Sequence, residues 1–134
     1  MSLDAALTQV QQSVPECVAV GFVDIKTGML LGIKTVDSHP QEVIDLVAAA
    51  TGDLFQGNNV STIESMFKKI RGVPDNNHHY FQEIIVLSDN LIHVFQRCKR
   101  NEDLVLCTVC RVSANLGMVL TKARMSLPKV EAAV

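Results

Sequence analysis

The sequence predicts an α/β fold of the α+β kind, in which a five-stranded, mainly antiparallel sheet has helices on both faces. Three observations favour it. Two apolar runs, at 17–25 and 29–36, flank a short turn of the kind that joins a β-hairpin. Three more apolar runs, at 81–87, 91–98 and 104–112, follow one another through short polar connections. Segments with helical spacing of apolar residues stand before, between and after these runs.

The first segment, residues 2–13, predicts an amphipathic helix because apolar side chains recur at spacings of three and four. Ser2 or Asp4 can cap its first turn, and Pro15 prevents its continuation. The apolar stripe consists of Leu3, Ala6, Leu7 and Val10.

The hairpin turn is predicted at Asp24–Gly28, because the glycine can adopt a positive φ without a clash. The strands on either side of it are apolar at both odd and even positions, so we expect both faces of the sheet to be covered.

A second helix is predicted from Pro40 to about Phe55, with polar and acidic residues at 37–42 as its start. Its centre, residues 48–52, consists of small side chains, Ala-Ala-Ala-Thr-Gly. Small side chains permit a close approach, either of the sheet of the same chain or of the same helix in a second copy. The sequence leaves both alternatives open.

The segment of about 58–80 is predicted to hold a short inserted helix and a polar loop. Ser61 and Glu64 have the spacing of a capping box, and Gly72 is suited to end the helix. The loop that follows contains the adjacent histidines His78 and His79.

The chain closes with three strands and a helix at about 114–127, which Pro128 is expected to end, with a loose tail over 130–134. The strand at 81–87 follows a long loop and is expected at an edge of the sheet. An apolar edge strand invites pairing with another strand, and a two-fold dimer satisfies that tendency.

Composition narrows the function classes. The chain has 134 residues, 48% hydrophobic and 19% charged, and a net charge of −2, which disfavours nucleic-acid binding. No apolar run approaches the roughly 18 residues of a membrane span. The first residues do not resemble a signal peptide, so we expect a cytoplasmic protein with four reduced cysteines.

No set of residues predicts a reaction, a cofactor or a metal site. Cys107 and Cys110 have a metal-motif spacing, but residues three apart in a strand point to opposite faces. His78 and His79 are interpreted as loop residues, and His93 as a core or interface residue. The carboxylates are scattered, and no glycine-rich phosphate loop is present. We therefore expect that the chain is not an enzyme.

The hairpin "GFVDIKTGMLLG" and the helix "PQEVIDLVAAATGDLFQG", followed by three strands and a helix, resemble the roadblock/dynein light-chain family. The resemblance covers most of residues 3–127. It implies one profilin-like domain over 1–134 with sheet order 2-1-5-4-3. It also implies a non-enzymatic homodimer that regulates or scaffolds a small Ras-like GTPase or a related signalling or motility partner. In bacterial members of that family the dimer binds a GTPase and can promote hydrolysis.

The resemblance places the dimer and partner contacts on the second helix and the third strand. The residues that it designates are Val47, Ala48, Ala49, Thr51, Gly52, Phe55, Glu83, Ile84, Ile85 and Val86. The insertion at about 58–80 is longer than the usual link in that family, and it can cover the dimer groove or a partner surface. The alternative function is a PAS-like or profilin-like small-molecule sensor, with His93, Arg97 and Thr108 as polar residues lining a cavity.

Overall fold

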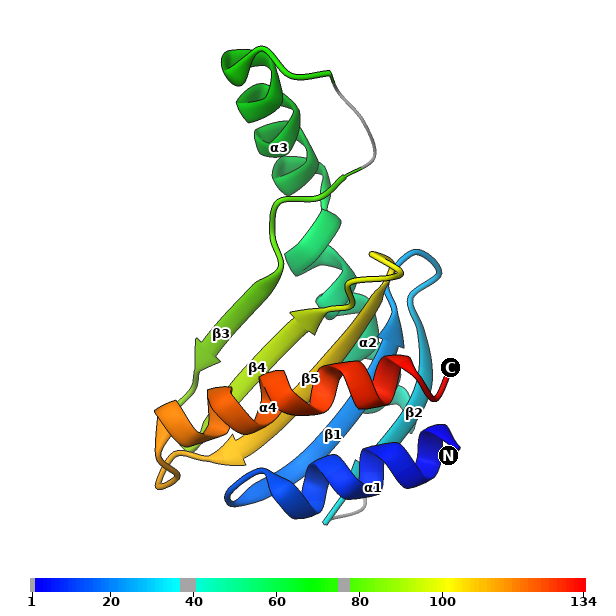
Figure 1. The fold of residues 1–134 in the computed structure, drawn as a ribbon, viewed down its shortest axis with the longest axis vertical. Coiled ribbons are helices and arrows are strands. Elements are labelled where there is room, and N and C mark those ends of the chain that lie inside the picture. Colours follow the sequence, from blue (N-terminus) through cyan, green and yellow to red (C-terminus); the bar gives the residue numbers. More distant parts are fainter. Residues whose placement is uncertain (1, 37–40, 75–77) are drawn as a thin grey trace.

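The computed structural model describes residues 2–36, 41–74 and 78–134, and its elements follow the predicted order (Figure 1). The elements are α1 (Leu3–Ser13), β1 (Cys17–Asp24), β2 (Met29–Thr35), α2 (Gln41–Gln56), α3 (Asn58–Arg71), β3 (Glu83–Leu87), β4 (Leu91–Arg97), β5 (Leu104–Arg111) and α4 (Leu116–Glu131).

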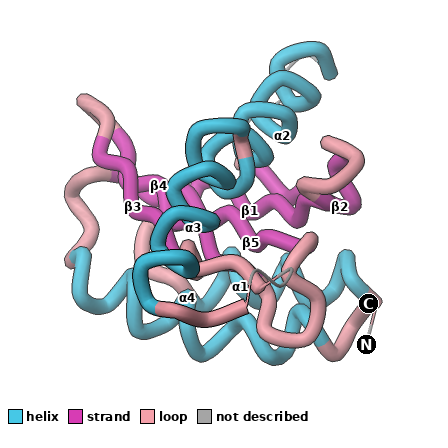
Figure 2. Tube along the Cα trace, turned by 90° about the horizontal axis from the view of Figure 1, so that it is seen from above, coloured by secondary structure: helices cyan, strands magenta, loops and turns pink. Residues whose placement is uncertain are grey.

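The five strands form one sheet in the order β2-β1-β5-β4-β3, and every neighbouring pair is antiparallel. The predicted sheet order is therefore confirmed. Helices α1 and α4 lie on one face and α2 lies on the other (Figure 2), so the prediction of helices on both faces is also confirmed. Helix α3 projects beyond one end of the sheet (Figure 1).

The turn between β1 and β2 forms as the sequence predicts. The carboxylate of Asp24 accepts hydrogen bonds from the backbone N–H groups of Lys26, at 3.0 Å, and Thr27, at 3.4 Å. Gly28 has a φ of 75°, which a residue with a β-carbon adopts only with strain. These contacts fix the register in which β1 pairs with β2.

Each face of the sheet carries its own hydrophobic cluster. Leu106 and Cys110 of β5 belong to the cluster under α1 and α4, whereas Val105 and Cys107 belong to the cluster under α2. The two cysteines of the metal-like spacing thus lie on opposite faces of the sheet, as strand geometry predicts.

Helix α2 is confirmed as a helix, although its predicted start at 37–40 lies outside the described residues. Its buried positions are Ala48, Thr51 and Phe55, each at most 1% exposed. A β-carbon on Gly52 would lie 3.3 Å from the carbonyl oxygen of Ile25. The small side chains therefore let α2 pack closely on its own sheet, which is the first of the two alternatives.

Helix α3 ends at Gly72, as predicted, because this residue adopts a left-handed φ of 70°. The predicted capping box is wrong. The helix begins at Asn58, one residue after its N-cap Gly57, so Ser61 lies inside the first turn and its hydroxyl donates to the carbonyl of Gln56 at 3.3 Å.

Helix α4 does not end at Pro128 but continues to Glu131, so the predicted loose tail is wrong at 130 and 131. Val130 is fully buried in the cluster under α1 and α4. The carboxylate of Glu131 accepts the backbone N–H groups of Lys99 and Arg100, at 2.7 and 3.1 Å. These tertiary contacts outweigh the one helical hydrogen bond that proline removes.

Candidate interaction surface

Strand β3 forms one edge of the sheet and pairs only with β4 among the described residues. Its last three side chains, Ile85, Val86 and Leu87, are 40%, 37% and 62% exposed. An edge with apolar side chains and unpaired backbone groups is a template for another strand. We call these three residues, with the free backbone of β3, the β3 edge.

The other predicted residues of β3 are occupied within the chain. The guanidinium of Arg124 on α4 binds both carboxylate oxygens of Glu83, at 2.6 and 3.1 Å, which ties α4 to the strand. Ile84 is half-buried and packs against the cluster under α2. Glu83 and Ile84 therefore hold β3 against the rest of the chain and do not belong to its exposed apolar surface.

The predicted residues of α2 divide between two faces. Ala48, Thr51 and Phe55 are buried in the core of their own chain, and Gly52 contacts Ile25. The three buried residues are not available to a partner in this structure, whereas Gly52 is half-buried. Val47 is 54% exposed, and Leu54, which the resemblance did not designate, is 38% exposed on the same side of the helix, seven residues further on. We call this side the outer face of α2. Ala49 is also exposed, but it lies on the opposite flank of the helix from Val47.

Helix α3 has an apolar side that the resemblance did not designate. Ile63, Met66, Phe67 and Ile70 recur at helical spacing and are 41%, 58%, 49% and 77% exposed. Together they expose roughly 500 Å², which is the size at which an apolar patch on a small protein marks an interaction site. We call these four residues the α3 stripe. The helical periodicity of this segment was visible in the sequence, but its exposure was not.

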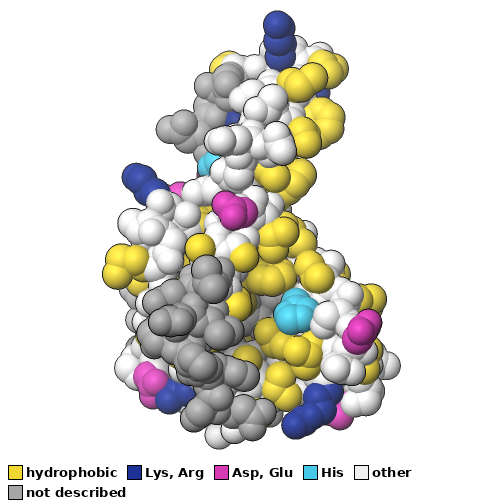
Figure 3. Space-filling model, turned by 180° about the vertical axis from the view of Figure 1, so that it is seen from behind, with side chains coloured by type: hydrophobic (Ala, Val, Ile, Leu, Met, Phe, Trp, Pro, Cys, Tyr) yellow, Lys and Arg dark blue, Asp and Glu magenta, His cyan; other side chains and the backbone are white. Residues whose placement is uncertain are grey.

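A groove of about 650 Å³ lies on the α2 face of the sheet, and strands β1, β2, β4 and β5 line it. Figure 3 shows apolar side chains gathered around a histidine on this face. The His93 ring stacks on Phe95, and its Nε2 lies 3.1 Å from the hydroxyl of Ser88. Burial lowers the pKa of His93.

The three polar residues expected to line a sensor cavity do not converge. His93 lines the groove. Thr108 lies on the opposite face of the sheet, the face of Leu106 and Cys110, and its hydroxyl has no hydrogen-bond partner among the described residues. Arg97 is 1% exposed and binds backbone carbonyls.

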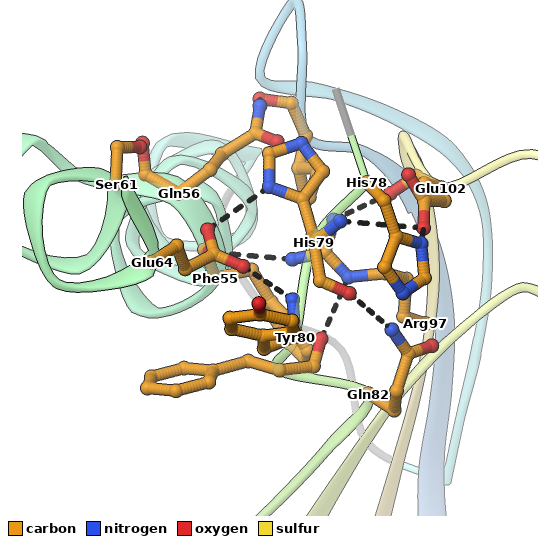
Figure 4. Close-up of polar contacts among 12 residues, drawn as sticks. Phe55, Gln56, Ser61, Glu64, His78, His79, Tyr80, Gln82, Arg97 and Glu102 are labelled. Atoms are coloured by element: carbon orange, nitrogen blue, oxygen red, sulfur yellow. Dashed lines mark hydrogen bonds and ion pairs between the residues drawn. The ribbon is translucent and has the colours of Figure 1, made fainter. Parts of the chain in front are cut away.

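Arg97 organises the junction between the sheet and α3, which Figure 4 shows in detail. Its guanidinium donates to the carbonyls of Phe81 at 2.7 Å, Glu102 at 2.9 Å and Phe55 at 3.1 Å. One side chain thus joins the segment before β3, the β4–β5 turn and the end of α2. Burial lowers the pKa of Arg97, while the carboxylates of Glu64 and Glu102 oppose that shift.

A second part of the junction holds α3 to the segment before β3 (Figure 4). The carboxylate of Glu64 on α3 is 3% exposed, lies 3.0 Å from Nδ1 of His79 and accepts the backbone N–H of Tyr80. His78 Nδ1 lies 2.7 Å from a carboxylate oxygen of Glu102. We call the contacts of Glu64, His78, His79, Arg97 and Glu102 the α3 junction.

The described residues contain no group of three or more histidine, cysteine, aspartate and glutamate side chains placed to hold a metal ion. Within the same residues, every helix is too short or too polar to cross a bilayer. The features that stand out are apolar and exposed: the β3 edge, the outer face of α2 and the α3 stripe. Such surfaces are suited to binding another protein.

Solved structures with the same arrangement include a roadblock/LC7 domain and MglB proteins. The roadblock/LC7 domain from Streptomyces avermitilis matches with a TM-score of 0.68 and 16% identity, over 98% of this chain and 97% of that chain. Myxococcus xanthus MglB matches with a TM-score of 0.70 and 14% identity, over 98% and 96%. The gliding protein MglB from Thermus thermophilus matches with a TM-score of 0.67 and 17% identity, over 97% and 88%.

No sequence-family model matches the chain, and no curated protein matches it in sequence. The likeness is therefore one of fold, and it extends over nearly the whole length of each structure. The chain has the roadblock/LC7 fold. The fold implied by the resemblance of the hairpin and the second helix is therefore confirmed.

Proposed function

We propose that this chain is a homodimeric interaction module of the roadblock type, and that the dimer regulates or scaffolds a small Ras-like GTPase in the cytoplasm. The observation that carries the proposal is the β3 edge, an apolar strand at the border of the sheet. Pairing of two such edges about a two-fold axis joins the sheets of two copies and covers the exposed backbone groups.

The roadblock fold supports the proposal, because the family resemblance implies dimers built from the third strand and the second helix. On α2, the contact is formed by the outer face, with Val47 and Leu54, rather than by the buried positions. The proposal includes no catalytic role for this chain.

The dimer is tested by sedimentation equilibrium of the native chain and of Ile85→Lys. A lysine at the centre of β3 places two charges beside each other across the axis and opposes pairing. We expect a dimer for the native chain and a monomer for the variant. Leu31→Lys is the matched control, since Leu31 is 43% exposed on β2 at the other edge of the sheet. If Ile85→Lys dimerises as strongly as Leu31→Lys, the β3 contact is contradicted.

The GTPase partner is tested separately. The immobilised native chain is exposed to extract from its own cells in the presence of GDP or of a non-hydrolysable GTP analogue. We expect a Ras-like GTPase, identified by mass spectrometry, to be retained in one nucleotide state, and the purified GTPase to bind the native chain. If no GTPase is retained in either state, the partner is contradicted, whereas the dimer is unaffected.

The groove of about 650 Å³ favours the second candidate function, a small-molecule sensor. Mass spectrometry of the native protein tests it. A small molecule that co-purifies with the native chain and is lost from His93→Ala supports the sensor. Protein that is free of small molecules after gentle purification contradicts it.

A further inference from the structure

We propose that the α3 stripe binds a second copy of this chain, so that α3 forms a second dimer contact next to the paired β3 edges. This inference rests on the proposed function, because it takes β3 pairing as the axis of the dimer. It assigns a role to the inserted segment, which the family resemblance leaves unexplained.

The direction of the stripe supports a second copy as the occupant. In Figure 1, β3 lies on the left-hand border of the sheet. Figure 3 shows the molecule from behind, and there the hydrophobic side chains of the projecting α3 gather on the right-hand side. Because the two views differ by half a turn about the vertical, the α3 stripe and the β3 edge face the same direction. A protein that pairs with β3 therefore arrives on the side where the stripe is exposed.

The geometry of antiparallel pairing brings a particular surface to this place. In a two-fold antiparallel pair, the end of one strand lies beside the start of the other. The start of β3 is the end that is attached to α3, through the hydrogen bond from the Tyr80 backbone N–H to the Glu64 carboxylate. The end of β3 carries Leu87, which is 62% exposed. Each copy thus brings an exposed leucine toward the base of α3 in the other copy.

The exposed apolar area is sufficient for a contact that includes α3. A standard stable interface buries about 800 Å² on each partner, and somewhat more than half of that area is apolar. The β3 edge, together with Val47 and Leu54 of α2, exposes roughly 400 Å² of apolar side chain, slightly less than this apolar share. The α3 stripe supplies an apolar area of similar size on the same side of the molecule. A contact that includes the α3 stripe therefore exceeds the apolar area of a standard interface.

The α3 junction holds the stripe in position before a partner binds. Glu64, which is 3% exposed, fixes α3 to His79 and Tyr80. The ring of Phe67 lies 6.4 Å from that of Tyr80, centroid to centroid. A buried carboxylate with two partners restrains the helix more than surface contacts do. The stripe is therefore presented outward on a fixed helix, which lowers the entropic cost of binding.

The test compares Ile70→Glu and Met66→Glu with the control Ser65→Glu. All three add one negative charge to an exposed position of α3, but Ser65 lies on a different side of the helix from Ile63, Phe67 and Ile70. Sedimentation equilibrium measures the dimer dissociation constant, and circular dichroism with urea unfolding verifies that each variant is folded. We expect the two stripe variants to raise the dissociation constant by about tenfold or more, and the control by less than about twofold.

The outcomes separate this inference from the proposed function. If Ile85→Lys gives a monomer while Ile70→Glu and Met66→Glu keep the native dissociation constant, the α3 contact is wrong and the β3 dimer stands. The stripe would then serve a different protein. If the native chain is a monomer at every concentration that can be reached, both the β3 dimer and the α3 contact are wrong.

Discussion

A guanidinium nitrogen of Arg97 lies 3.1 Å from the carbonyl oxygen of Phe55, which belongs to the last turn of α2. The guanidinium group also lies over the Phe55 ring, 5.0 Å from its centroid. Carbonyls in the last turn of a helix have no partner within the helix, and a cation there complements the helix dipole. This contact joins α2 to β4 at the point from which α3 departs, and it therefore sets the position of the α3 stripe relative to the β3 edge.

Removal of the Arg97 side chain is predicted to destabilise the fold. Arg97→Ala leaves three carbonyls, those of Phe55, Phe81 and Glu102, without their charged donor in a site that is 1% exposed. We expect the free energy of unfolding to fall by about 3 kcal/mol. Urea unfolding followed by circular dichroism measures this change.

Arg100→Ala is the control for that measurement. Arg100 is exposed at the β4–β5 turn, so we expect a change within about 0.5 kcal/mol. Equal stabilities of the two variants would contradict the role of Arg97 in the junction.

Glu131→Ala is predicted to weaken the end of α4. The backbone N–H groups of Lys99 and Arg100 would lose their acceptor, at a cost of about 1–2 kcal/mol in the free energy of unfolding. Chemical denaturation measures the loss, and Lys129→Ala, an exposed change on the same turn, is the control. A variant as stable as the control would show that α4 does not depend on this carboxylate beyond Pro128.

Stability is predicted to depend on pH through His93. Burial lowers the pKa of His93 below its ordinary value of 6.5, so the folded state binds a proton less readily than the unfolded state. Between the folded pKa and 6.5, the unfolded state holds more protons, and stability therefore falls as pH falls through this window.

His93→Gln removes this part of the pH dependence. We expect the difference in urea midpoint between about pH 7.5 and about pH 5 to be smaller in the variant than in the native chain. The same pH dependence in both proteins would contradict the assignment to His93.

Two of the cysteines are predicted to resist alkylation in the folded protein. Burial raises the pKa of Cys98 and Cys107 to about 12, so neither is appreciably a thiolate at about pH 8. Intact-mass analysis after brief iodoacetamide treatment should show both residues unmodified in the native chain and modified in urea. Rapid native labelling at Cys107 would mean that the α2 face opens readily.

The fold was predictable because its information is local. Apolar runs separated by short polar turns defined the strands, and the Asp24–Gly28 turn fixed the hairpin. The family resemblance then supplied the sheet order. The error at the end of α4 arose because long-range contacts override a local signal. Pro128 is a reliable end to a helix by itself, but burial of Val130 and the hydrogen bonds to Glu131 extend α4 past it.

The candidate surface was predictable only in part. The β3 edge followed from an apolar strand after a long loop, and β3 does lie at an edge. The sequence pattern did not show which face of α2 is buried. Val47 and Ala48 are both apolar, but only Ala48 is buried. The α3 junction combines Arg97, Glu64 and three backbone carbonyls from separate segments, a set that no sequence spacing encodes.

The central claim is that two copies join along β3, and hydrogen–deuterium exchange at the amides of residues 83–87 tests it most directly. An unpaired edge leaves backbone N–H groups open to water, whereas a continuous sheet protects them. Alternate amides of β3 bond to β4 in the monomer, so the informative amides are those of residues 83–87 that point away from β4. We predict protection of these amides that increases with protein concentration and disappears in Ile85→Lys, while the amides of β1 exchange slowly in both. Rapid exchange of the outward-pointing amides at every concentration would contradict a dimer joined at this strand.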